Sequence, residues 1–305
     1  MSSQIILNGL RSETGSSGKA SLFLRRALGK KYSATQWIIS VERIPYMALK
    51  PLHNPETGIL RVVGLMSGSG TNLRRILERQ RAIEKAEGKS PFEMVIIFSN
   101  DARSKAPEIG RDFAVPVLTH DMRAWYDRRN ADRRDLKLRA KFDRETIRML
   151  NPFKPKLAAF GGYMAVATAP LLKTFIGINV HPADLSIKVG NHRKYTGDHA
   201  VLDAILTGDK TIASSTHIVE AQVDMGRLLM ISVPLPVNLP PGADMSDKEK
   251  AKQIADEHQE RLKEKGDWVI FPKTIEDIAR GKYAQDENGA LYYDGKPIPE
   301  GIRLA

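Results

Sequence analysis

The fold of this chain is decided by the stretch Ile59-Leu60-Arg61-Val62-Val63-Gly64-Leu65-Met66-Ser67-Gly68-Ser69-Gly70-Thr71-Asn72. Its first eight residues are mainly aliphatic and β-branched, which predicts a buried strand. The residues after the stretch predict a helix, because Leu73, Ile76, Leu77 and Ile83 fall on one face. A strand, a glycine-rich turn and a helix N-terminus form an anion site, since backbone N–H groups and the helix dipole both favour negative charge.

Two familiar nucleotide motifs are excluded at this turn. A dinucleotide fingerprint requires a third glycine where Leu73 stands, and a P-loop requires a lysine that is absent here. The turn therefore predicts a site for one phosphate monoester. A tight turn without a ligand is the alternative, because a short glycine-rich turn is a weak signal.

Strand-like and helix-like segments alternate after this unit. The strand-like segments are 92–99, 115–119, 156–161, 175–181, 212–220 and 228–234, and the helix-like segments are 106–114, 121–150, 198–206, 244–265 and 274–280. This alternation predicts an α/β fold with a doubly wound, mainly parallel sheet. Residues 183–196 are expected to be irregular, and Asp294-Gly295 predicts a hairpin turn near the C-terminus.

Residues 1–57 do not resemble the start of this fold. The segment contains a Ser- and Gly-rich stretch at 12–18, a short basic helix candidate at 20–28, a strand candidate at 36–41 and several prolines near its end. We therefore expect two parts, an N-terminal extension of unknown role at 1–57 and a main domain at 58–305.

The chain carries a net charge of +11, and residues 1–61 hold nine Lys/Arg against three Asp/Glu. A basic surface favours anionic partners such as phosphorylated metabolites, polyglutamylated cofactors or RNA, although a merely solubilising surface is favoured over specific RNA binding. The absence of Cys excludes disulfides and thiolate nucleophiles. No apolar run is long enough to span a membrane and no secretory signal is evident, so a cytoplasmic protein is expected.

The chemistry is predicted at Gly177-Ile178-Asn179-Val180-His181-Pro182, read with Val223-Asp224-Met225-Gly226. Side chains alternate along a strand, so Asn179 and His181 point to the same side. The amide and the imidazole could stabilise a developing oxyanion, and a carboxylate such as Asp224 could raise the pKa of His181. Without a Ser or Cys partner, the three suit transfer to an external nucleophile. A capping or core role is the alternative for Asn179 and His181.

With these motifs in view, residues 60–303 resemble the phosphoribosylglycinamide formyltransferase branch of the folate-dependent formyltransferase family. The resemblance rests on an ordered series of motifs. These are the loop at 67–72, Phe98-Ser99-Asn100, Phe142-Asp143-Arg144-Glu145, Gly162-Tyr163-Met164, Asn179-Val180-His181-Pro182, Thr216-His217-Ile218-Val219, Val223-Asp224-Met225-Gly226 and Tyr293-Asp294-Gly295-Lys296-Pro297.

The resemblance implies a Rossmann-like catalytic domain with the formyltransferase fold, 10-formyltetrahydrofolate as the donor, a phosphorylated amine as the acceptor and no metal. Nucleic acid and membrane partners are not expected, and the chain would be a monomer or a homodimer. The implied catalytic residues are Asn179, His181 and Asp224. The implied acceptor contacts are Gly70, Thr71, Asn72, Arg139 near the phosphate, and Asp267 near the amine. The implied donor contacts are Met164, Ala165, Val166 and Gln222.

The sequence departs from the family pattern near the acceptor end of the site. Ala183-Asp184-Leu185-Ser186 replaces the family's Ser-Leu-Leu-Pro, and about seven extra residues follow around Gly190–Arg193. A basic residue common after Met164 is Ala165 here, and Asp267 stands where the family has Glu. Glycinamide ribonucleotide is the expected acceptor. Amino-sugar nucleotides, secondary metabolites, methionyl-tRNA, or a non-catalytic role in ligand binding are the alternatives.

Overall fold

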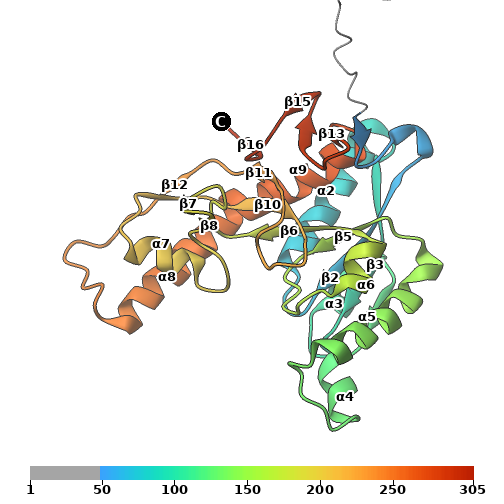
Figure 1. The fold of residues 1–305 in the computed structure, drawn as a ribbon, viewed down its shortest axis with the longest axis horizontal. Helices are drawn as coiled ribbons and strands as arrows, with labels where there is room; N and C mark the ends of the chain where they lie inside the picture. The colour runs from blue at the N-terminus through green and yellow to red at the C-terminus, as the bar shows by residue number, and fades with distance from the viewer. Residues whose placement is uncertain (1–48) are drawn as a thin grey trace, which may run out of the picture. The chain divides into compact units, whose positions relative to one another are not determined.

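A central eight-stranded sheet organises the computed structural model, which describes residues 49–305 (Figure 1). The strand order is β16-β11-β10-β6-β5-β2-β3-β4. β10 runs antiparallel to β6 and β11, and the other neighbouring pairs of this sheet are parallel. The predicted mainly parallel sheet is therefore confirmed. Its strands are β2 (Leu60–Met66), β3 (Phe92–Ser99), β4 (Val117–Thr119), β5 (Leu157–Phe160), β6 (Ile176–His181), β10 (Ser215–Ile218), β11 (Leu228–Ile231) and β16 (Ile302–Arg303).

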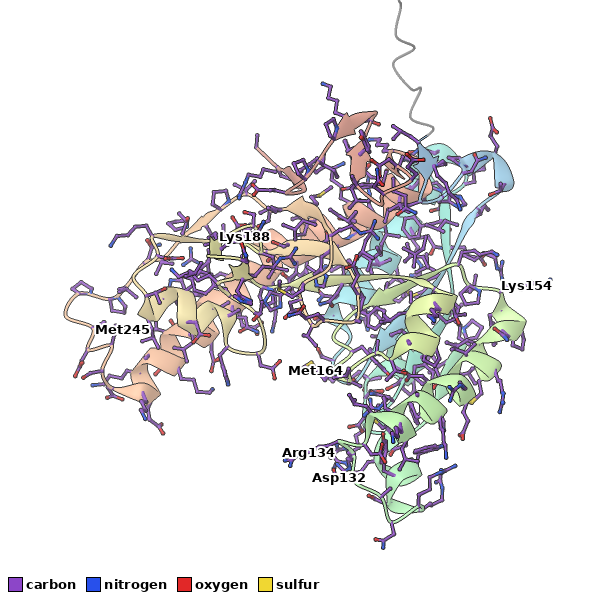
Figure 2. All side chains as sticks on the ribbon, viewed as in Figure 1. Asp132, Arg134, Lys154, Met164, Lys188 and Met245 are labelled. Atoms are coloured by element: carbon purple, nitrogen blue, oxygen red, sulfur yellow. The ribbon has the colours of Figure 1, made fainter. Side chains whose placement is uncertain are left out.

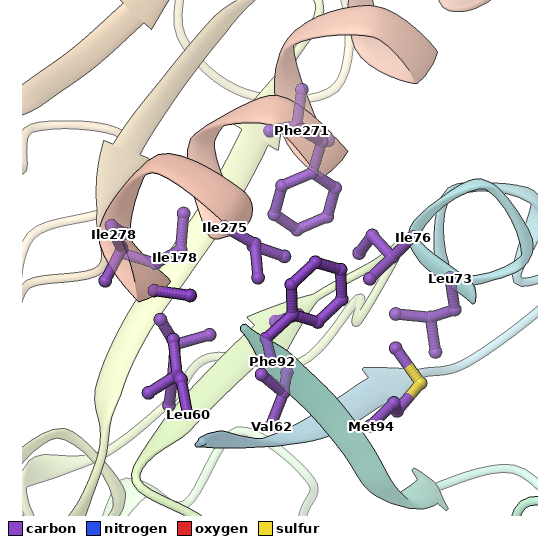
Figure 3. Packing of buried hydrophobic residues seen from close by; sticks show 14 of the residues in the cluster. Leu60, Val62, Leu73, Ile76, Phe92, Met94, Ile178, Phe271, Ile275 and Ile278 are labelled. Carbon is purple, nitrogen blue, oxygen red and sulfur yellow. The ribbon is translucent and has the colours of Figure 1, made fainter. Parts of the chain in front are cut away.

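Helices cover both faces of the sheet, as a doubly wound fold requires. On one face, apolar side chains of α2 (Thr71–Glu87), α3 (Ala106–Phe113) and α9 (Trp268–Ala279) pack on alternate strand residues. Figure 3 shows Leu73 and Ile76 of α2 meeting Phe271 and Ile275 of α9 above Val62, Phe92 and Met94. On the other face lie α4 (Met122–Asp127), α5 (Leu136–Leu150) and α6 (Ala169–Thr174).

A smaller apolar cluster lies beside the sheet, between α7 (Ala200–Leu206) and α8 (Lys248–Leu262). Asp247 caps α8 by accepting hydrogen bonds from the backbone N–H groups of Glu249 and Lys250. Two short antiparallel pairs adjoin this cluster, β7 (Lys188–Val189) with β8 (His192–Arg193), and β9 (Thr211–Ile212) with β12 (Leu235–Pro236). The segment 183–196, expected to be irregular, thus contains a hairpin.

The C-terminal hairpin predicted from Asp294-Gly295 is confirmed. It joins β14 (Leu291–Tyr293) to β15 (Lys296–Pro297), and both turn residues have positive φ. In the same small sheet, β1 (Lys50–Pro51) pairs with β13 (Tyr283–Gln285), and η1 (Pro55–Thr57) follows. Residues 50–57 therefore include a strand of this small sheet and the turn that follows it. The elements predicted at 20–28 and 36–41 lie outside the described residues.

Two helical predictions differ from the structure in extent. The single helix expected over 121–150 is two helices, because Asp121 caps α4, Asn130 turns the chain with a positive φ, and Asp135 caps α5. The helix expected from 274 begins at Trp268, where Ile270 and Phe271 already face the core. The 3₁₀ turn η2 (Asn151–Phe153) follows α5, and the π-helical turn η3 (Lys263–Asp267) joins α8 to α9. Among residues 49–305, no helix is long and apolar enough to cross a membrane.

Candidate active site

The candidate site is built where β6 ends beside β10. Asn179 and His181 alternate along β6, and the antiparallel register sets His217 of β10 opposite Asn179. Asp224 lies on the loop that connects β10 to β11. A side chain at Gly226 of this loop would place its Cβ 1.7 Å from the Ile218 carbonyl oxygen, so only glycine lets the loop close this tightly. The structure thereby brings the three predicted catalytic residues together.

The Asp224 carboxylate lies between two imidazoles. Its Oδ2 is 3.5 Å from Nδ1 of His181, and its Oδ1 is 3.6 Å from Nε2 of His217. The backbone N–H of Gly197 also donates a 2.9 Å hydrogen bond to Oδ2. On the far side of the His181 ring, Nε2 lies 3.2 Å from the carbonyl oxygen of Tyr195. Both ring nitrogens of His181 therefore face oxygen acceptors.

The pKa values of Asp224 and His181 both lie below the ordinary values of these groups. Burial opposes ionisation of Asp224, but the neighbouring imidazoles of His217 and His181 and the Gly197 N–H prevail and bring the pKa of Asp224 to about 2. Burial also lowers the pKa of His181, and the opposing charge of Asp224 only partly offsets it. The expectation that Asp224 raises the pKa of His181 above its ordinary value was therefore wrong. The influence of Asp224 has the expected sign, but desolvation of the imidazolium is larger.

His217 is a site residue to which the sequence analysis assigned no role. Its Nδ1 lies 2.9 Å from the Ile218 carbonyl oxygen and therefore carries the ring hydrogen. Its Nε2 then accepts a 3.3 Å hydrogen bond from the side-chain amide of Asn179. This contact fixes which end of the Asn179 amide is the NH₂ group. One amide hydrogen is used by His217, and the second remains to donate to a ligand. The available signal was a histidine inside the predicted strand 212–220, in the motif Thr216-His217-Ile218-Val219.

The glycine-rich turn leads into α2 as predicted. Gly70 caps the helix in a left-handed conformation (φ 66°), so the chain enters α2 without a side-chain cap. The first N–H groups of a helix have no carbonyl partner within the helix, which leaves those of Thr71 and Asn72 to bind an anion. Ser67, at the start of the turn, accepts a 2.9 Å hydrogen bond from the backbone N–H of Met164. The turn is therefore tied to the predicted donor segment.

Asp267 is buried in the π-helical turn η3, behind the same turn. Its Oδ1 accepts a 2.5 Å hydrogen bond from the Ser214 hydroxyl. Burial raises the pKa of Asp267 to about 6, while Ser214, Lys263 and the side chain of Asn72 act against the shift. The structure thus brings Asp267 and Asn72 together. π-helical turns occur frequently at functional sites.

The pKa of Asp267 predicts a fall in stability with rising pH. The folded protein holds the Asp267 proton up to about pH 6, whereas the unfolded chain releases it near pH 4. The contribution of Asp267 to the free energy of unfolding is therefore present at low pH and is lost as the pH rises from about 4 to about 6. A pKa difference of about two between the folded and unfolded chain corresponds to about 3 kcal/mol. Asp267→Asn should remove this part of the pH dependence and be more stable than wild type at pH 7.5. Urea denaturation of both proteins at pH 4.5 and 7.5 measures it, and parallel curves would contradict the assignment.

Two neighbouring clefts meet at Ala165 and Val166. The first, here called the Asp224 cleft, is lined by Phe160, Tyr163, Ala165, Val166, Ala167, Asn179, His217, Val219, Glu220, Ala221, Gln222, Val223 and Asp224. The second, here called the arginine cleft, is lined by Ser67, Asn100, Asp101, Met122, Arg123, Arg133, Arg139, Met164, Ala165 and Val166. Met164 is largely exposed at this junction, on the side of the molecule where Arg134 also lies (Figure 2). The predicted donor residues Met164, Ala165, Val166 and Gln222 all line one or both clefts.

Arg139 is the buried cation of the arginine cleft. It is 6% exposed, its Nη1 has no hydrogen-bond partner among the described residues, and its guanidinium lies over the rings of Tyr126 and Phe142. Gly70, Thr71 and Asn72 are not part of this cleft's wall. A buried guanidinium without a carboxylate partner indicates an anionic ligand group. Residues 49–305 contain no cluster of His, Asp or Glu side chains arranged to hold a metal ion.

Comparison with known proteins agrees with this geometry. The formyl transferase family model matches residues 60–258. A phosphoribosylglycinamide formyltransferase of Escherichia coli (strain K12) is 26% identical over 243 residues, which cover 79% of this chain and 96% of the relative. The Mycobacterium tuberculosis (strain ATCC 25618 / H37Rv) protein of the same name is 30% identical over 190 residues, covering 62% of this chain and 76% of the relative.

Solved structures share the fold. Glycinamide ribonucleotide transformylase 1 from Symbiobacterium toebii aligns with a TM-score of 0.55 and 25% identity, over 77% of this chain and 94% of that one. Phosphoribosylglycinamide formyltransferase from Coxiella burnetii aligns with a TM-score of 0.59 and 22% identity, over 81% of this chain and 100% of that one.

Proposed function

This chain belongs to the formyl transferase family, and we propose that it transfers a formyl group from 10-formyltetrahydrofolate to the primary amine of glycinamide ribonucleotide, a step of purine biosynthesis. The observation that carries this proposal is the convergence of Asn179, His181 and Asp224 at the end of β6, beside a cleft that continues past Ala165 to three arginines. The names of the relatives support the acceptor.

The donor fits the two clefts in shape and charge. The Asp224 cleft offers apolar side chains on one wall and the exposed residues 220–223 on the other, which suits a flat heterocycle with polar edges. The arginine cleft suits the glutamate carboxylates at the other end of a folate. We therefore assign Arg139 to the donor's carboxylates. The sequence analysis had placed it near the acceptor phosphate.

In the reaction, the acceptor amine attacks the formyl carbon, a new C–N bond forms, and the C–N bond to the folate breaks. The free hydrogen of the Asn179 amide stabilises the oxyanion that develops. His181 is neutral in the resting site because burial lowers its pKa. It gains a proton as the amine attacks, and Asp224 and the Tyr195 carbonyl stabilise the imidazolium so formed. The imidazolium then returns this proton to the folate nitrogen as the C–N bond to the folate breaks. The products are an N-formyl amide and tetrahydrofolate.

The acceptor phosphate is assigned to the N–H groups of Gly70, Thr71 and Asn72, and the acceptor amine to the side of Asp267. Asn72 connects the two assignments, because it belongs to the turn and also faces Asp267. A helix N-terminus suits the terminal phosphate monoester of glycinamide ribonucleotide.

Gly70 and Gly68 provide a matched test of the phosphate assignment. A Cβ at Gly70 would lie 2.6 Å from both Met66 Cε and Ile109 Cδ1 at a φ of +66°, whereas a Cβ at Gly68 meets nothing within 4 Å. Gly70→Ala should therefore distort the turn and raise the acceptor KM far more than the donor KM. Gly68→Ala should leave both close to wild type. Equal effects of Gly70→Ala on the two substrates would contradict the assignment.

An acceptor panel tests the proposed function itself. The protein is incubated with 10-formyltetrahydrofolate and either glycinamide ribonucleotide, glycinamide riboside without the phosphate, an amino-sugar nucleotide or methionyl-tRNA. We expect the highest kcat/KM with glycinamide ribonucleotide and a large loss for the riboside. A higher kcat/KM with the amino-sugar nucleotide or the tRNA would identify that compound as the acceptor instead. Donor binding without turnover on any amine would favour a non-catalytic binding protein.

A further inference from the structure

The hairpin β7–β8, labelled in Figure 1, contacts the loop that carries Asp224 through the side chain of Arg193. At the end of β8, Nη1 of Arg193 donates to the carbonyl oxygen of Asp224, and Nη2 donates a 2.7 Å hydrogen bond to that of Gly226. The two carbonyls flank Met225, so one guanidinium bridges the turn of the loop. These contacts come from the segment around Gly190–Arg193, where the sequence analysis expects a departure from the family pattern.

Arg193 bonds the carbonyls of Asp224 and Gly226, which the other hydrogen bonds of the loop leave unbonded among residues 49–305. Those other bonds join Met225 N–H to the Gln222 carbonyl and Arg227 to Glu220. Residues 220–223 are exposed, and Asp224 adopts a left-handed conformation (φ 53°), which is costly for a residue other than glycine. Asp224 must nevertheless aim its carboxylate at His181 and His217. A guanidinium is suited to fix two carbonyls at once, because its N–H groups form a rigid planar fork.

We propose that Arg193 is a positioning residue for formyl transfer, fixing the backbone of 224–226 so that the Asp224 carboxylate stays directed at His181. The residues that follow it in the chain act in the same direction. Tyr195 gives its carbonyl to Nε2 of His181, and Gly197 gives its N–H to Oδ2 of Asp224. The effect on rate rests on the proposed function, whereas the effect on geometry does not.

A matched control exists at the other end of the same segment. Arg303 of β16 also makes two side-chain hydrogen bonds, to Oδ2 of Asp184 at 2.8 Å and to Oγ of Ser186 at 2.6 Å. It anchors residues 183–197 without contacting the loop at 224–226. If Arg193 were only a structural anchor, replacing Arg193 and replacing Arg303 should therefore have the same effect on kcat.

The experiment compares Arg193→Met, Arg193→Lys and Arg303→Met in the full chain. Arg193→Met should lower kcat by about 100-fold, the effect of a misplacement of about 1 Å, with little change in either KM. Arg193→Lys should fall between this variant and wild type, because one ammonium cannot bond both carbonyls in a fork. Arg303→Met should keep wild-type kcat even if its melting temperature falls as far.

NMR titration of His181 separates geometry from activity. The titratable and charged groups around His181 and Asp224 are His217 of β10, Asp198 after the hairpin, Glu220 of the loop and Arg193 itself. If the Asp224 carboxylate is no longer held near His181, it raises the pKa of His181 less. The titration midpoint of His181 should therefore move to lower pH in Arg193→Met and stay in place in Arg303→Met. If no variant transfers formyl groups but this shift appears, the proposed function fails and the positioning role stands. The proposal is overturned if Arg193→Met leaves both kcat and the midpoint unchanged, or if it fails to fold while Arg193→Lys has full kcat.

Discussion

We expect Asp224→Asn to lower kcat by about two to four orders of magnitude, the range for acid–base groups, with little change in donor binding. The substitution keeps the shape of the side chain but removes the charge that stabilises the His181 imidazolium. Stopped assays at saturating donor and acceptor measure kcat, and isothermal titration measures the donor Kd. Asp209→Asn is the matched control. Asp209, which follows α7, pairs at 3.3 Å with Lys194, the neighbour of Arg193 in the chain, and does not contact Asn179, His181 or Asp224. This control should keep wild-type kcat.

The same variant has a signature in the pH profile. Burial lowers the pKa of His181 and the charge of Asp224 raises it, so removing that charge must lower it further. Because the resting enzyme requires neutral His181, kcat/KM should rise as the pH increases through the His181 pKa, and this rise should move to lower pH in Asp224→Asn. A rise that stays in place together with near-normal turnover would mean that Asp224 is not the partner of His181.

Asn179→Ala should slow the chemical step by the loss of one oxyanion donor. Removal of such a donor raises the barrier by about 2.7–4 kcal/mol, which is a loss of about 10²- to 10³-fold in kcat. The KM values should change little, because the second amide hydrogen acts mainly in the transition state. Asn100→Ala is a suitable comparison, because it removes the side-chain amide of a residue that follows β3. Asn100 lines the arginine cleft but not the Asp224 cleft. An Asn179→Ala protein with wild-type kcat but a raised donor KM would make Asn179 a binding residue.

The parts of the fold that local sequence determines were predictable. Local sequence predicts three consecutive elements within about thirty residues: the apolar strand 60–66, the glycine turn and the amphipathic helix after it. The strand β3 has the predicted bounds 92–99. The C-terminal hairpin followed from turn chemistry, because Asp294 and Gly295 tolerate positive φ. Asn179 and His181 could be placed on one side of a strand because the side-chain period of a strand is two.

Most of the properties that were missed depend on contacts between distant segments. The role of His217 requires the antiparallel register of β10 against β6, which no local pattern encodes. The pKa of His181 depends on how deeply the folded chain buries it, so the charge of Asp224 alone gave the wrong sign. The hairpin at 188–193 was missed because strands of two residues carry too little alternation to be detected. The function of Arg193 becomes apparent only when β8 meets the loop at 224–226.

The central claim is direct formyl transfer within the site of Asn179, His181 and Asp224, without a covalent enzyme intermediate. A single-turnover reaction with 10-formyltetrahydrofolate labelled with ¹³C in the formyl group tests it most directly, with enzyme in excess and glycinamide ribonucleotide as acceptor. We expect the ¹³C signal to move from the folate to the acceptor amide in one step, with no label on the protein at any time, and to move far more slowly in Asp224→Asn. Label that accumulates on the protein, or a folded wild-type protein that binds the donor and never transfers the label, would contradict the claim.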